Sequence, residues 1–308
     1  MVLSPNLNIN FMGARRIALI FSAVAIVFSL GSLVTRGLNF GLDFSGGYLL
    51  EMSYSSEVDL ADIRSALAEE GFENPLVQNF GTVSDVLVRL MPQDVAGDTE
   101  TRDRVVATLS AQDPSAELQR FEFVGPQVGD ELTEDGALAM LIALVLIFIY
   151  VMLRFRWKFA VGTISALVHD VIIVFGFFSI FGVAFDLTIV AALLATIGYS
   201  LNDTIVVFDR IRENFRVMRR GTAKEIINAS INQMLGRTMI TSLTTLLVLL
   251  CLFFLGGEAI SGFALALVVG VIIGTYSSIY IASASALALN VSSTDLIPQK
   301  REEIDDMP

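Results

Sequence analysis

The run AALLATIGYSLNDTIVVF, from Ala191 to Phe208, decides how the chain folds, because it places the carboxylate of Asp203 inside an apolar stretch. A charged side chain at the centre of a bilayer helix costs about 2.5 to 3.5 kcal/mol on insertion scales, so such residues usually face a protein interior and mark ion or proton paths. The run therefore predicts a transmembrane helix whose Asp203 faces other helices.

The composition is that of a membrane protein. Of the 308 residues, 54% are hydrophobic, and the mean hydropathy is +0.68, which lies outside the range of ordinary soluble domains. Six apolar runs are long enough to cross a bilayer core, which needs roughly 17 to 25 helical residues. We therefore expect six transmembrane helices, over Ile17 to Val34, Gly136 to Leu153, Phe159 to Val183, Leu187 to Phe208, Thr238 to Leu255, and Gly262 to Leu289.

The distribution of charge predicts the orientation, because Lys and Arg are enriched in cytoplasmic loops. Of the 20 basic residues, 14 lie on the side of the membrane that holds both termini. Residues 36–135 hold the other 6, all Arg, against 20 Asp and Glu, which gives this segment a net charge of −14. We therefore expect a multi-pass membrane protein with cytoplasmic termini and an acidic exterior segment, and the acidity argues against nucleic acid as a partner.

The expected organisation has four parts: the cytoplasmic N-terminus with helix 1 (1–35), an exterior domain (36–135), which the resemblance described below makes periplasmic, helices 2 to 6 (136–289), and a cytoplasmic C-terminal tail (290–308). The first apolar run exceeds the roughly 7 to 15 residues of a signal-peptide core, so it is interpreted as a retained anchor. Cys251 is the only cysteine, which excludes a disulfide framework and a CxxC metal site.

Within residues 36–135 the hydrophobic period changes in a regular order. Strand patterns occur at 48–54, 76–80, 86–91 and 118–124, and helical patterns at 60–67 and 101–109. The order βαββαβ predicts an α+β, ferredoxin-like domain with two helices on one face of its sheet. The predicted fold class is an α-helical polytopic membrane protein of six transmembrane helices, with this domain inserted between helices 1 and 2. The domain has no His or Cys, so binding or mechanical coupling is favoured over catalysis, and we do not expect an enzyme.

Two glycine-rich joints flank this domain and are candidate hinges. The first contains Gly41, Asp43, Gly46 and Gly47 in the run GLDFSGG. It lacks the Lys and the following helix that a phosphate-binding P-loop requires, so a tight structural joint is favoured. Gly125 and Pro126 form the return joint, where they end the last strand before the chain re-enters the membrane.

Arg237 is the candidate partner of Asp203. Arg210 marks the cytoplasmic end of the fourth helix, and a rise of 1.5 Å per residue puts Asp203 about 10 Å inside that end. Residues 223–235 form either an amphipathic helix along the inner surface or the start of the fifth helix. If the fifth helix begins near Ala229, Arg237 lies about 12 Å inside. Antiparallel neighbouring helices would then bring Asp203 and Arg237 together.

Polar residues in the same two helices support this pair. Ser200 and Thr204 share a face with Asp203, whereas Thr241, Thr244 and Thr245 share a face with Arg237. The expected polar lining is completed by Asn202, His169 and Asp170. Hydroxyls at such spacing can bond across helices or hold water beside an acid that gains and loses a proton. A conformational change that separates the pair would switch its protonation; the alternative is a static salt bridge that fixes helix register.

His169 and Asp170 are a weaker second site, about 15 Å into the third helix. Adjacent residues of a helix face different directions, so we do not expect these two to form one cluster. A single His is weak evidence for a metal site, which usually has three or four ligands; neither a metal nor a cofactor is predicted. Small residues four apart, at Gly270 and Gly274, permit close helix contact either within the bundle or with another membrane subunit.

Four segments occur in a characteristic order: GLDFSGG (41–47), RFRWKFAVGTISALVHD (154–170), AALLATIGYSLNDTIVVFDRIREN (191–214) and GRTMITSLTTLLVLLCLFFLGG (236–257). Together they resemble the SecF branch of the SecD/SecF family of bacterial protein-export membrane subunits, within the resistance-nodulation-division superfamily. The resemblance covers residues 39–289.

The resemblance implies a six-helix half-bundle in the bacterial inner membrane that pairs with SecD and works beside the SecYEG channel. It also implies a small YajC-like accessory subunit and the preprotein as further partners, and use of the proton-motive force, or of a sodium gradient in some relatives. By motif position, Asp203 and Arg237 are the coupling acid and arginine, and the domain at 36–135 moves with the cycle. Two other hypotheses stay open, namely a half-transporter for lipids or small molecules and a scaffold without ion coupling.

Overall fold

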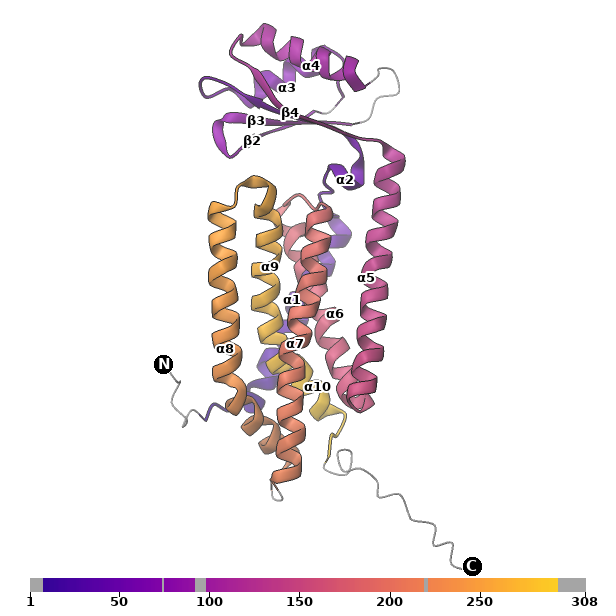
Figure 1. Ribbon diagram of the computed structural model, residues 1–308, viewed down its shortest axis with the longest axis vertical. Coiled ribbons are helices and arrows are strands. Elements are labelled where there is room, and N and C mark those ends of the chain that lie inside the picture. Colours follow the sequence, from indigo (N-terminus) through magenta and orange to yellow (C-terminus); the bar gives the residue numbers. More distant parts are fainter. Residues whose placement is uncertain (1–7, 74, 92–97, 219–220, 293–308) are drawn as a thin grey trace, which may run out of the picture.

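A bundle of six long helices carries a small sheet domain on one end (Figure 1). The computed structural model describes residues 8–73, 75–91, 98–218 and 221–292, so that most of the expected C-terminal tail lies outside the described residues. The six crossings are α1 (Phe11–Thr35), α5 (Pro126–Arg154), α6 (Trp157–Phe181), α7 (Leu187–Val217), α8 (Ala223–Leu255), and the segment Ile260–Ala288.

The last crossing combines three helical pieces: α9 (Glu258–Ser277), the π-helical turn η1 (Ser278–Ala282) and α10 (Ser283–Ala288). All six crossings are long and apolar enough to span a membrane, which confirms the expected membrane fold. At the start of α8, Thr222 and Glu225 form a capping box, in which each side chain accepts a backbone N–H of the other. Residues 223–235 are therefore the first turns of the fifth crossing, and no separate surface helix forms.

The sheet domain has the predicted βαββαβ order. Its strands β1 (Gly47–Ser53), β2 (Leu76–Phe80), β3 (Thr82–Leu90) and β4 (Glu117–Val124) pair antiparallel in the order β2-β3-β1-β4. The helices α3 (Leu60–Glu69) and α4 (Asp98–Gln112) cover the face turned away from the bundle (Figure 1). Alternate residues of β1 and β3 are buried beneath them, for example Leu50 opposite Val88, as the period of two requires.

The two joints connect the sheet domain to the bundle without a long linker. In the first joint, the short helix α2 (Leu42–Ser45) is followed by Gly46 and Gly47, whose positive φ angles of 65° and 114° favour glycine. In the return joint, Gly125 caps α5, and Pro126 occupies its first turn, where the missing N–H costs nothing. Helix α5 therefore starts ten residues before Gly136, and its first turns reach from the membrane crossing to the sheet domain.

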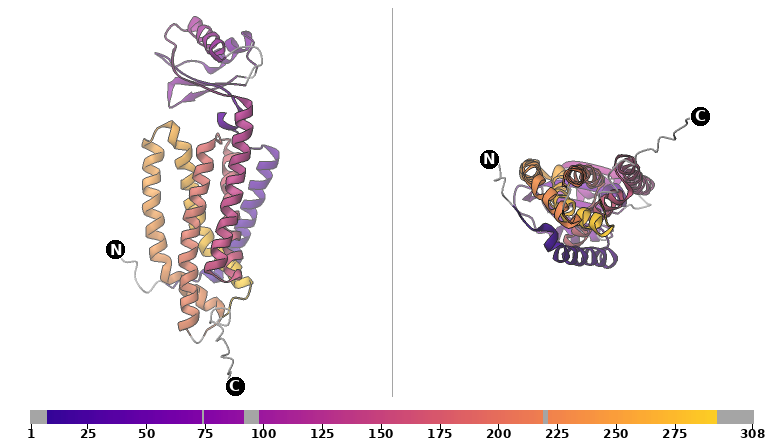
Figure 2. Two further views of the ribbon diagram at one scale, coloured as in Figure 1. Left: turned by 45° about the vertical axis from the view of Figure 1, so that its right-hand side comes forward. Right: turned by 90° about the horizontal axis from the view of Figure 1, so that it is seen from below.

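Small residues let the helices pack closely. A side chain at Gly270 of α9 would meet Thr196 of α7 at 2.4 Å, and one at Gly274 would meet Ser200 at 3.0 Å. The glycine face of the last crossing is therefore used for packing inside the bundle, in the manner common to membrane helices. Figure 2 shows α1 on the outside of the bundle, where its outward face exposes large apolar side chains such as Ile17 and Val27.

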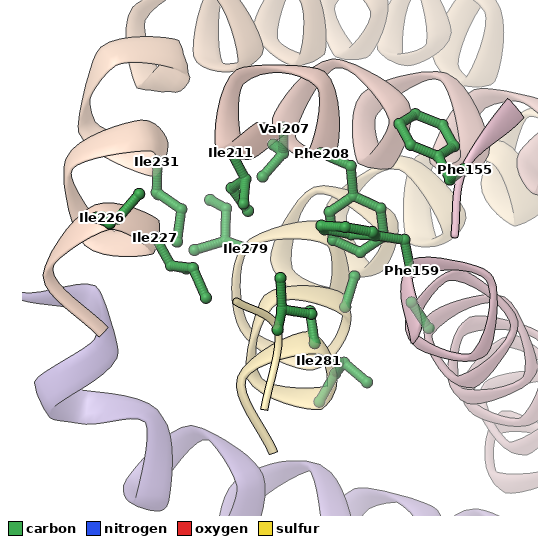
Figure 3. Close-up of a cluster of buried hydrophobic side chains, with 14 of the residues drawn as sticks. Phe155, Phe159, Val207, Phe208, Ile211, Ile226, Ile227, Ile231, Ile279 and Ile281 are labelled. Carbon is green, nitrogen blue, oxygen red and sulfur yellow. The ribbon is translucent and has the colours of Figure 1, made fainter. Parts of the chain in front are cut away.

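Two apolar clusters close the ends of the bundle. The one remote from the sheet domain is built around the rings of Phe155, Phe159 and Phe208, with isoleucines from α7, α8 and η1 (Figure 3). The other, next to the sheet domain, contains Phe178 and Phe185 with aliphatic residues of α6, α7 and α9. Buried polar residues lie in the same helices between these two clusters, and they form the candidate functional site.

Candidate functional site

Asp203 is buried in the middle of the bundle, with 7% of its surface exposed. Its position on α7 places it one turn before Val207, the first α7 residue of the remote apolar cluster. The Thr238 hydroxyl of α8 donates a hydrogen bond of 2.9 Å to Asp203 Oδ1. Among the described residues, no group forms a hydrogen bond with the buried Oδ2. Thr238 thus holds one oxygen of this carboxylate, and the hydroxyl of Ser278 also lies close enough to interact with the carboxylate.

Arg237 does not form the expected ion pair with Asp203. Its side chain is exposed on the outer face of α8, and among the described residues no salt bridge joins it to Asp203. The two charges interact through space instead. The physical reason is the helical turn of about 100° per residue, since Thr238, the next residue, occupies the face that α8 presents to α7.

The buried polar face of α8 is therefore the one that contains Thr238, and it differs from the expected face that contains Arg237. Thr238 and Ser242 are buried, four residues apart, and Ser242 bonds with Thr275 of α9 at 2.7 Å. The hydroxyls of Thr241 and Thr244 are exposed and donate to carbonyls of their own helix, and Thr245 is half-buried. Asn202 of α7 is also exposed. These four residues, expected in the polar lining, therefore do not line the site.

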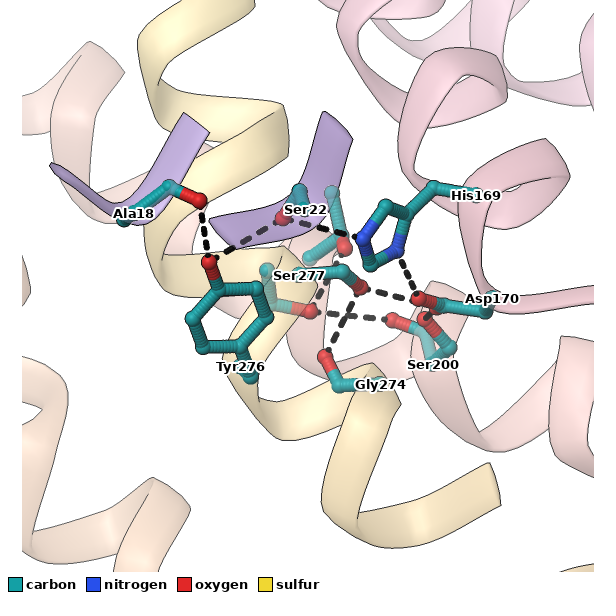
Figure 4. Close-up of polar contacts among 10 residues, drawn as sticks. Ala18, Ser22, His169, Asp170, Ser200, Gly274, Tyr276 and Ser277 are labelled. Carbon is teal, nitrogen blue, oxygen red and sulfur yellow. Dashed lines mark hydrogen bonds and ion pairs between the residues drawn. The ribbon is translucent and has the colours of Figure 1, made fainter. Parts of the chain in front are cut away.

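His169 and Asp170 do form one cluster, contrary to the expectation from their adjacency (Figure 4). The two side chains turn toward each other, and His169 Nδ1 lies 2.9 Å from Asp170 Oδ1. They are only 3% and 1% exposed. The hydroxyls of Ser200 and Ser277 donate to the other carboxylate oxygen, Oδ2, at 2.7 and 2.8 Å. Asp170 is therefore bonded from α6, α7 and α9 at once.

The other nitrogen of the imidazole reaches α1. His169 Nε2 lies 3.1 Å from Ser22 Oγ, which lies 3.0 Å from the hydroxyl of Tyr276. Tyr276 donates in turn to the carbonyl of Ala18 at 2.7 Å, and its ring stacks beside the imidazole with centroids 6.1 Å apart. The cluster thus links the first crossing to the last.

Two consecutive serines connect the surroundings of Asp170 with those of Asp203. Ser277 donates to Asp170, whereas Ser278 lies 2.8 Å from Thr204 Oγ1 and approaches the carbonyl oxygen of Ser200 at 3.5 Å. Ser278 begins the π-helical turn η1, and such turns are frequent at functional sites. We call the buried groups described here the polar layer: Ser22, His169, Asp170, Ser200, Asp203, Thr204, Thr238, Tyr276, Ser277 and Ser278.

The polar layer combines two carboxylates, an imidazole and hydroxyls between two apolar clusters. Such groups can bind, hold and pass protons, and hydrogen bonds gain strength in a medium of low dielectric. Within the described ranges, no group of three or more His, Cys, Asp or Glu side chains is arranged to hold a metal ion. The chemistry that this layer offers is proton exchange by Asp203, Asp170 and His169.

The glycine joint is tied to the start of α7, the helix that carries Asp203. The Asp43 carboxylate accepts a 2.9 Å hydrogen bond from the N–H of Leu187, and the N–H of Gly41 donates to Phe185 at 2.7 Å. A side chain at Gly41 would meet Asp186 at 2.9 Å. These contacts hold α2 against the N-terminus of α7, and no side chain larger than hydrogen fits at Gly41.

Arg89 of β3 connects the sheet domain to the contact between the glycine joint and the start of α7. Its guanidinium donates a hydrogen bond of 2.9 Å to the carbonyl of Phe40, and the carboxylates of Asp186 and Asp43 attract its charge. Burial lowers the pKa of Arg89 from its ordinary value, while the two carboxylates oppose that shift. The side chain therefore acts as a cationic tie between the sheet domain and the bundle.

Several of these residues were not among the sequence candidates. The i, i+4 spacing of Thr238 and Ser242 is a signal that the sequence offers for these two residues. The charge of Arg237 instead favours the neighbouring face of the same helix. The pair Ser277 and Ser278 interrupts an apolar crossing, which is a usable signal. Nothing in the sequence brings Ser22, Tyr276 or Arg89 to the site, because their partners lie far away along the chain.

Comparison with known proteins connects this architecture to a family. A family model described as "Protein export membrane protein SecD/SecF, C-terminal" matches residues 104–292, and one described as "SecD/SecF GG Motif" matches residues 31–58. The protein translocase subunit SecF of Vibrio alginolyticus is 50% identical over 312 residues, which cover 100% of this chain and 99% of the relative. SecF of Pseudomonas aeruginosa is 52% identical, with 98% of each chain covered.

Two solved structures share the fold. The crystal structure of SecDF, a translocon-associated membrane protein from Thermus thermophilus, aligns with a TM-score of 0.85 and 40% identity over 92% of this chain. SecDF in a super-membrane-facing form aligns with a TM-score of 0.68 at the same identity over 94% of this chain. In both cases this chain covers 39% of the solved chain. This chain is more similar in fold to the first of these structures, as the two TM-scores show.

Proposed function

The chain belongs to the SecD/SecF family of protein-export membrane proteins, and from this premise we propose that it couples an ion gradient to late-stage protein export. Its relatives of similar length are named protein translocase subunits, so protein transport in a membrane is its general role. The proposed part of that role is non-catalytic: protons, or sodium ions, cross at the polar layer and drive motion of the sheet domain.

The observation that carries the proposal is the state of the Asp203 carboxylate. It lies in the middle of a bundle of membrane helices, with Oδ1 bonded to Thr238 and with no hydrogen bond to Oδ2 from the part of the chain that the structure describes. An intramembrane acid in such a place is expensive to keep, and ion or proton transport is its usual reason. Apolar clusters on both sides separate the acid from either end of the bundle, as an occluded stage of a transport cycle requires.

The two joints supply a path for mechanical coupling. Helix α7 carries Asp203 and begins beside Asp43, to which the N–H of Leu187 donates. The sheet domain is tied to the same corner by Arg89. A shift of α7 on protonation of Asp203 would therefore reach the sheet domain through short contacts.

The proposed partner is SecD. The solved neighbour that supports this proposal is named SecDF, and this chain aligns with 39% of its length. We propose the SecYEG channel, a YajC-like subunit and the preprotein as further partners. The proposed location is the bacterial inner membrane with both termini cytoplasmic and the acidic sheet domain in the periplasm, in agreement with the basic residues at the remote end of the bundle.

The test is gradient-driven export in inverted vesicles that contain the chain together with SecD. Asp203→Asn is expected to abolish stimulation of export by the gradient, a loss of about tenfold or more, while assembly with SecD persists. Asp209→Asn is the matched control, because it removes an exposed carboxylate of the same helix that pairs with Arg154. Collapsing the proton and sodium gradients separately identifies the ion.

A parental response to the gradient in Asp203→Asn contradicts the proposal. The joint replacement Asp203→Leu with Arg237→Leu separates coupling from scaffolding. Loss of export in an assembled complex of that double variant supports ion coupling, whereas retained export indicates a scaffold. Normal export on deletion of the chain, together with altered lipid or drug handling, would instead indicate a half-transporter.

A further inference from the structure

We propose that the pair His169–Asp170 is a second proton-binding site, distinct from Asp203 and located between it and the sheet end of the bundle. This inference rests on the proposed function, since it assigns the route by which a proton reaches Asp203. It uses a buried acid and a buried base that the coupling role of Asp203 does not itself require.

The charge balance of the pair carries the proposal. Hydroxyls face the pair from the other helices: Ser22 from α1, Ser200 from α7, and Tyr276 and Ser277 from α9. None of these groups supplies a positive charge to balance an ionised Asp170. Burying an unpaired carboxylate is costly, and a protonated partner removes most of that cost. His169, at 2.9 Å, is the base that can supply the compensating charge by taking up one proton.

The proton balance can be written atom by atom. In the empty state, Nδ1–H of a neutral imidazole donates to Asp170 Oδ1, and Nε2 accepts from the hydroxyl of Ser22; the pair has a net charge of −1. An added proton binds Nε2, the Ser22 hydroxyl turns to accept, and the pair becomes neutral. The carboxylate of Asp170 only accepts, which places a proton on Nδ1. The single proton of the Ser22 hydroxyl points to Nε2 in the empty state and to the Tyr276 oxygen once Nε2 is protonated, because Tyr276 donates its own proton to Ala18.

The His169–Asp170 pair lies closer than Asp203 to the end of the bundle that carries the sheet domain. Asp170 lies eleven residues from Phe181, the sheet end of α6, or about 17 Å along the axis. Asp203 lies sixteen residues from Leu187, the sheet end of α7, or about 24 Å. A proton entering from that end therefore meets the His169–Asp170 pair first.

Serine hydroxyls lie between the surroundings of the two acids. Ser200 donates to Asp170 and lies three residues before Asp203 on the same face of α7. Ser277 and Ser278 lie between Asp170 and Thr204. Transfer takes the proton from the neutral pair to Asp203 Oδ2, which has no donor among the described residues. The pair returns to a charge of −1 and Asp203 becomes neutral.

The first test is proton entry into proteoliposomes that contain the chain with SecD and an enclosed pH-sensitive dye. Asp170→Asn and His169→Gln are each expected to slow proton entry by about tenfold or more, as is Asp203→Asn. Ser22→Ala, which removes the hydroxyl at Nε2, is expected to slow it measurably. Ser32→Ala is the matched control, since Ser32 joins α1 to Ser179 of α6 outside the cluster and is expected to leave the rate unchanged.

The outcomes separate the two proposals. Parental proton entry in both Asp170→Asn and His169→Gln, with Asp203→Asn blocked, overturns the second site and leaves the proposed function standing. Parental proton entry in Asp203→Asn overturns the proposed function instead. Block in all three variants, with assembly intact, supports both.

A second test uses the single histidine of the chain and needs no transport. The full-length chain, purified without a histidine tag and placed in lipid nanodiscs with ¹⁵N-labelled histidine, gives one imidazole to follow between about pH 5 and pH 9. We expect the signal to change from a singly to a doubly protonated ring in the parent and in Asp203→Asn. The same ring should stay singly protonated over more of this range in Asp170→Asn. An imidazole that never gains the second proton in the parent overturns the proposal.

Discussion

Thr238 and Arg237 show how much depends on a single step along a helix. The two residues are neighbours, yet Thr238 donates to Asp203 and Arg237 lies on the outer face of α8. The sequence identified both the acid and the arginine, because charges in apolar runs are conspicuous. It could not assign the inward face of α8, since that face is set by how the helix is rotated against α7.

A prediction at the residue scale follows from the hydrogen bond that Thr238 donates to Asp203. Thr238→Val keeps the shape of the side chain and removes the hydroxyl, so the buried carboxylate loses the 2.9 Å hydrogen bond to its Oδ1 and, of its hydroxyl contacts among the described residues, keeps only the interaction with Ser278. We expect the free energy of unfolding to fall by about 1 to 3 kcal/mol and gradient-driven export to weaken. Denaturation in detergent and vesicle export are the measurements.

The matched control for this change is Thr241→Val. The Thr241 hydroxyl is exposed and donates only to carbonyls of its own helix, so the effect on unfolding should stay within about 0.5 kcal/mol. Equal losses of stability in the two variants would show that the Thr238 bond to Asp203 contributes nothing specific.

At the scale of elements, the bundle is held by helices that approach closely at glycines. Gly176 of α6 is the tightest case, because a Cβ there would lie 2.1 Å from Ser29 Oγ and 2.6 Å from Ser29 Cα of α1. The backbone atom cannot move aside without shifting the helix. The contact between α1 and α6 also carries Ser22 and His169, so the spacing of these helices sets the geometry of the polar layer.

Gly176→Ala should therefore destabilise the protein by about 1 to 3 kcal/mol, the usual range for overpacking. It should also weaken proton-driven export, because α1 is pushed away from His169. Gly198→Ala in α7 is the control, since a Cβ at Gly198 meets nothing within 4 Å. Thermal unfolding in detergent tests the first effect; unchanged stability in Gly176→Ala would mean that α1 is not packed against α6 as described.

At the scale of the whole molecule, the sheet domain contacts the bundle at the corner where Asp43, Asp186 and Arg89 gather. Arg89 is the side chain that β3 contributes to this corner. If the sheet domain moves as a unit during export, this contact must open and close.

Arg89→Gln is expected to loosen the sheet domain. Spin labels at the native Cys251 of α8, the only cysteine, and at Ser65→Cys of α3 report the separation of the two parts. We expect a broader distance distribution in Arg89→Gln, because the cationic tie to Asp43 and Asp186 is lost. Arg64→Gln is the control: Arg64 donates to a carbonyl within the sheet domain, at Val77. A distribution as narrow as the parent's in Arg89→Gln would contradict the tie.

The sequence by itself determined the parts that depend on local pattern. Apolar run length gave six crossings, alternating periods gave the βαββαβ order, and the cost of a buried charge singled out Asp203. Only the tertiary structure decided which side chains meet: Thr238 in place of Arg237 at Asp203, and His169 with Asp170, Ser22 and Ser277 in one cluster. The physical reason is that burial cost and periodicity act within one segment, whereas a contact depends on the rotation and spacing of separate helices, which packing at residues such as Gly176 and Gly274 fixes.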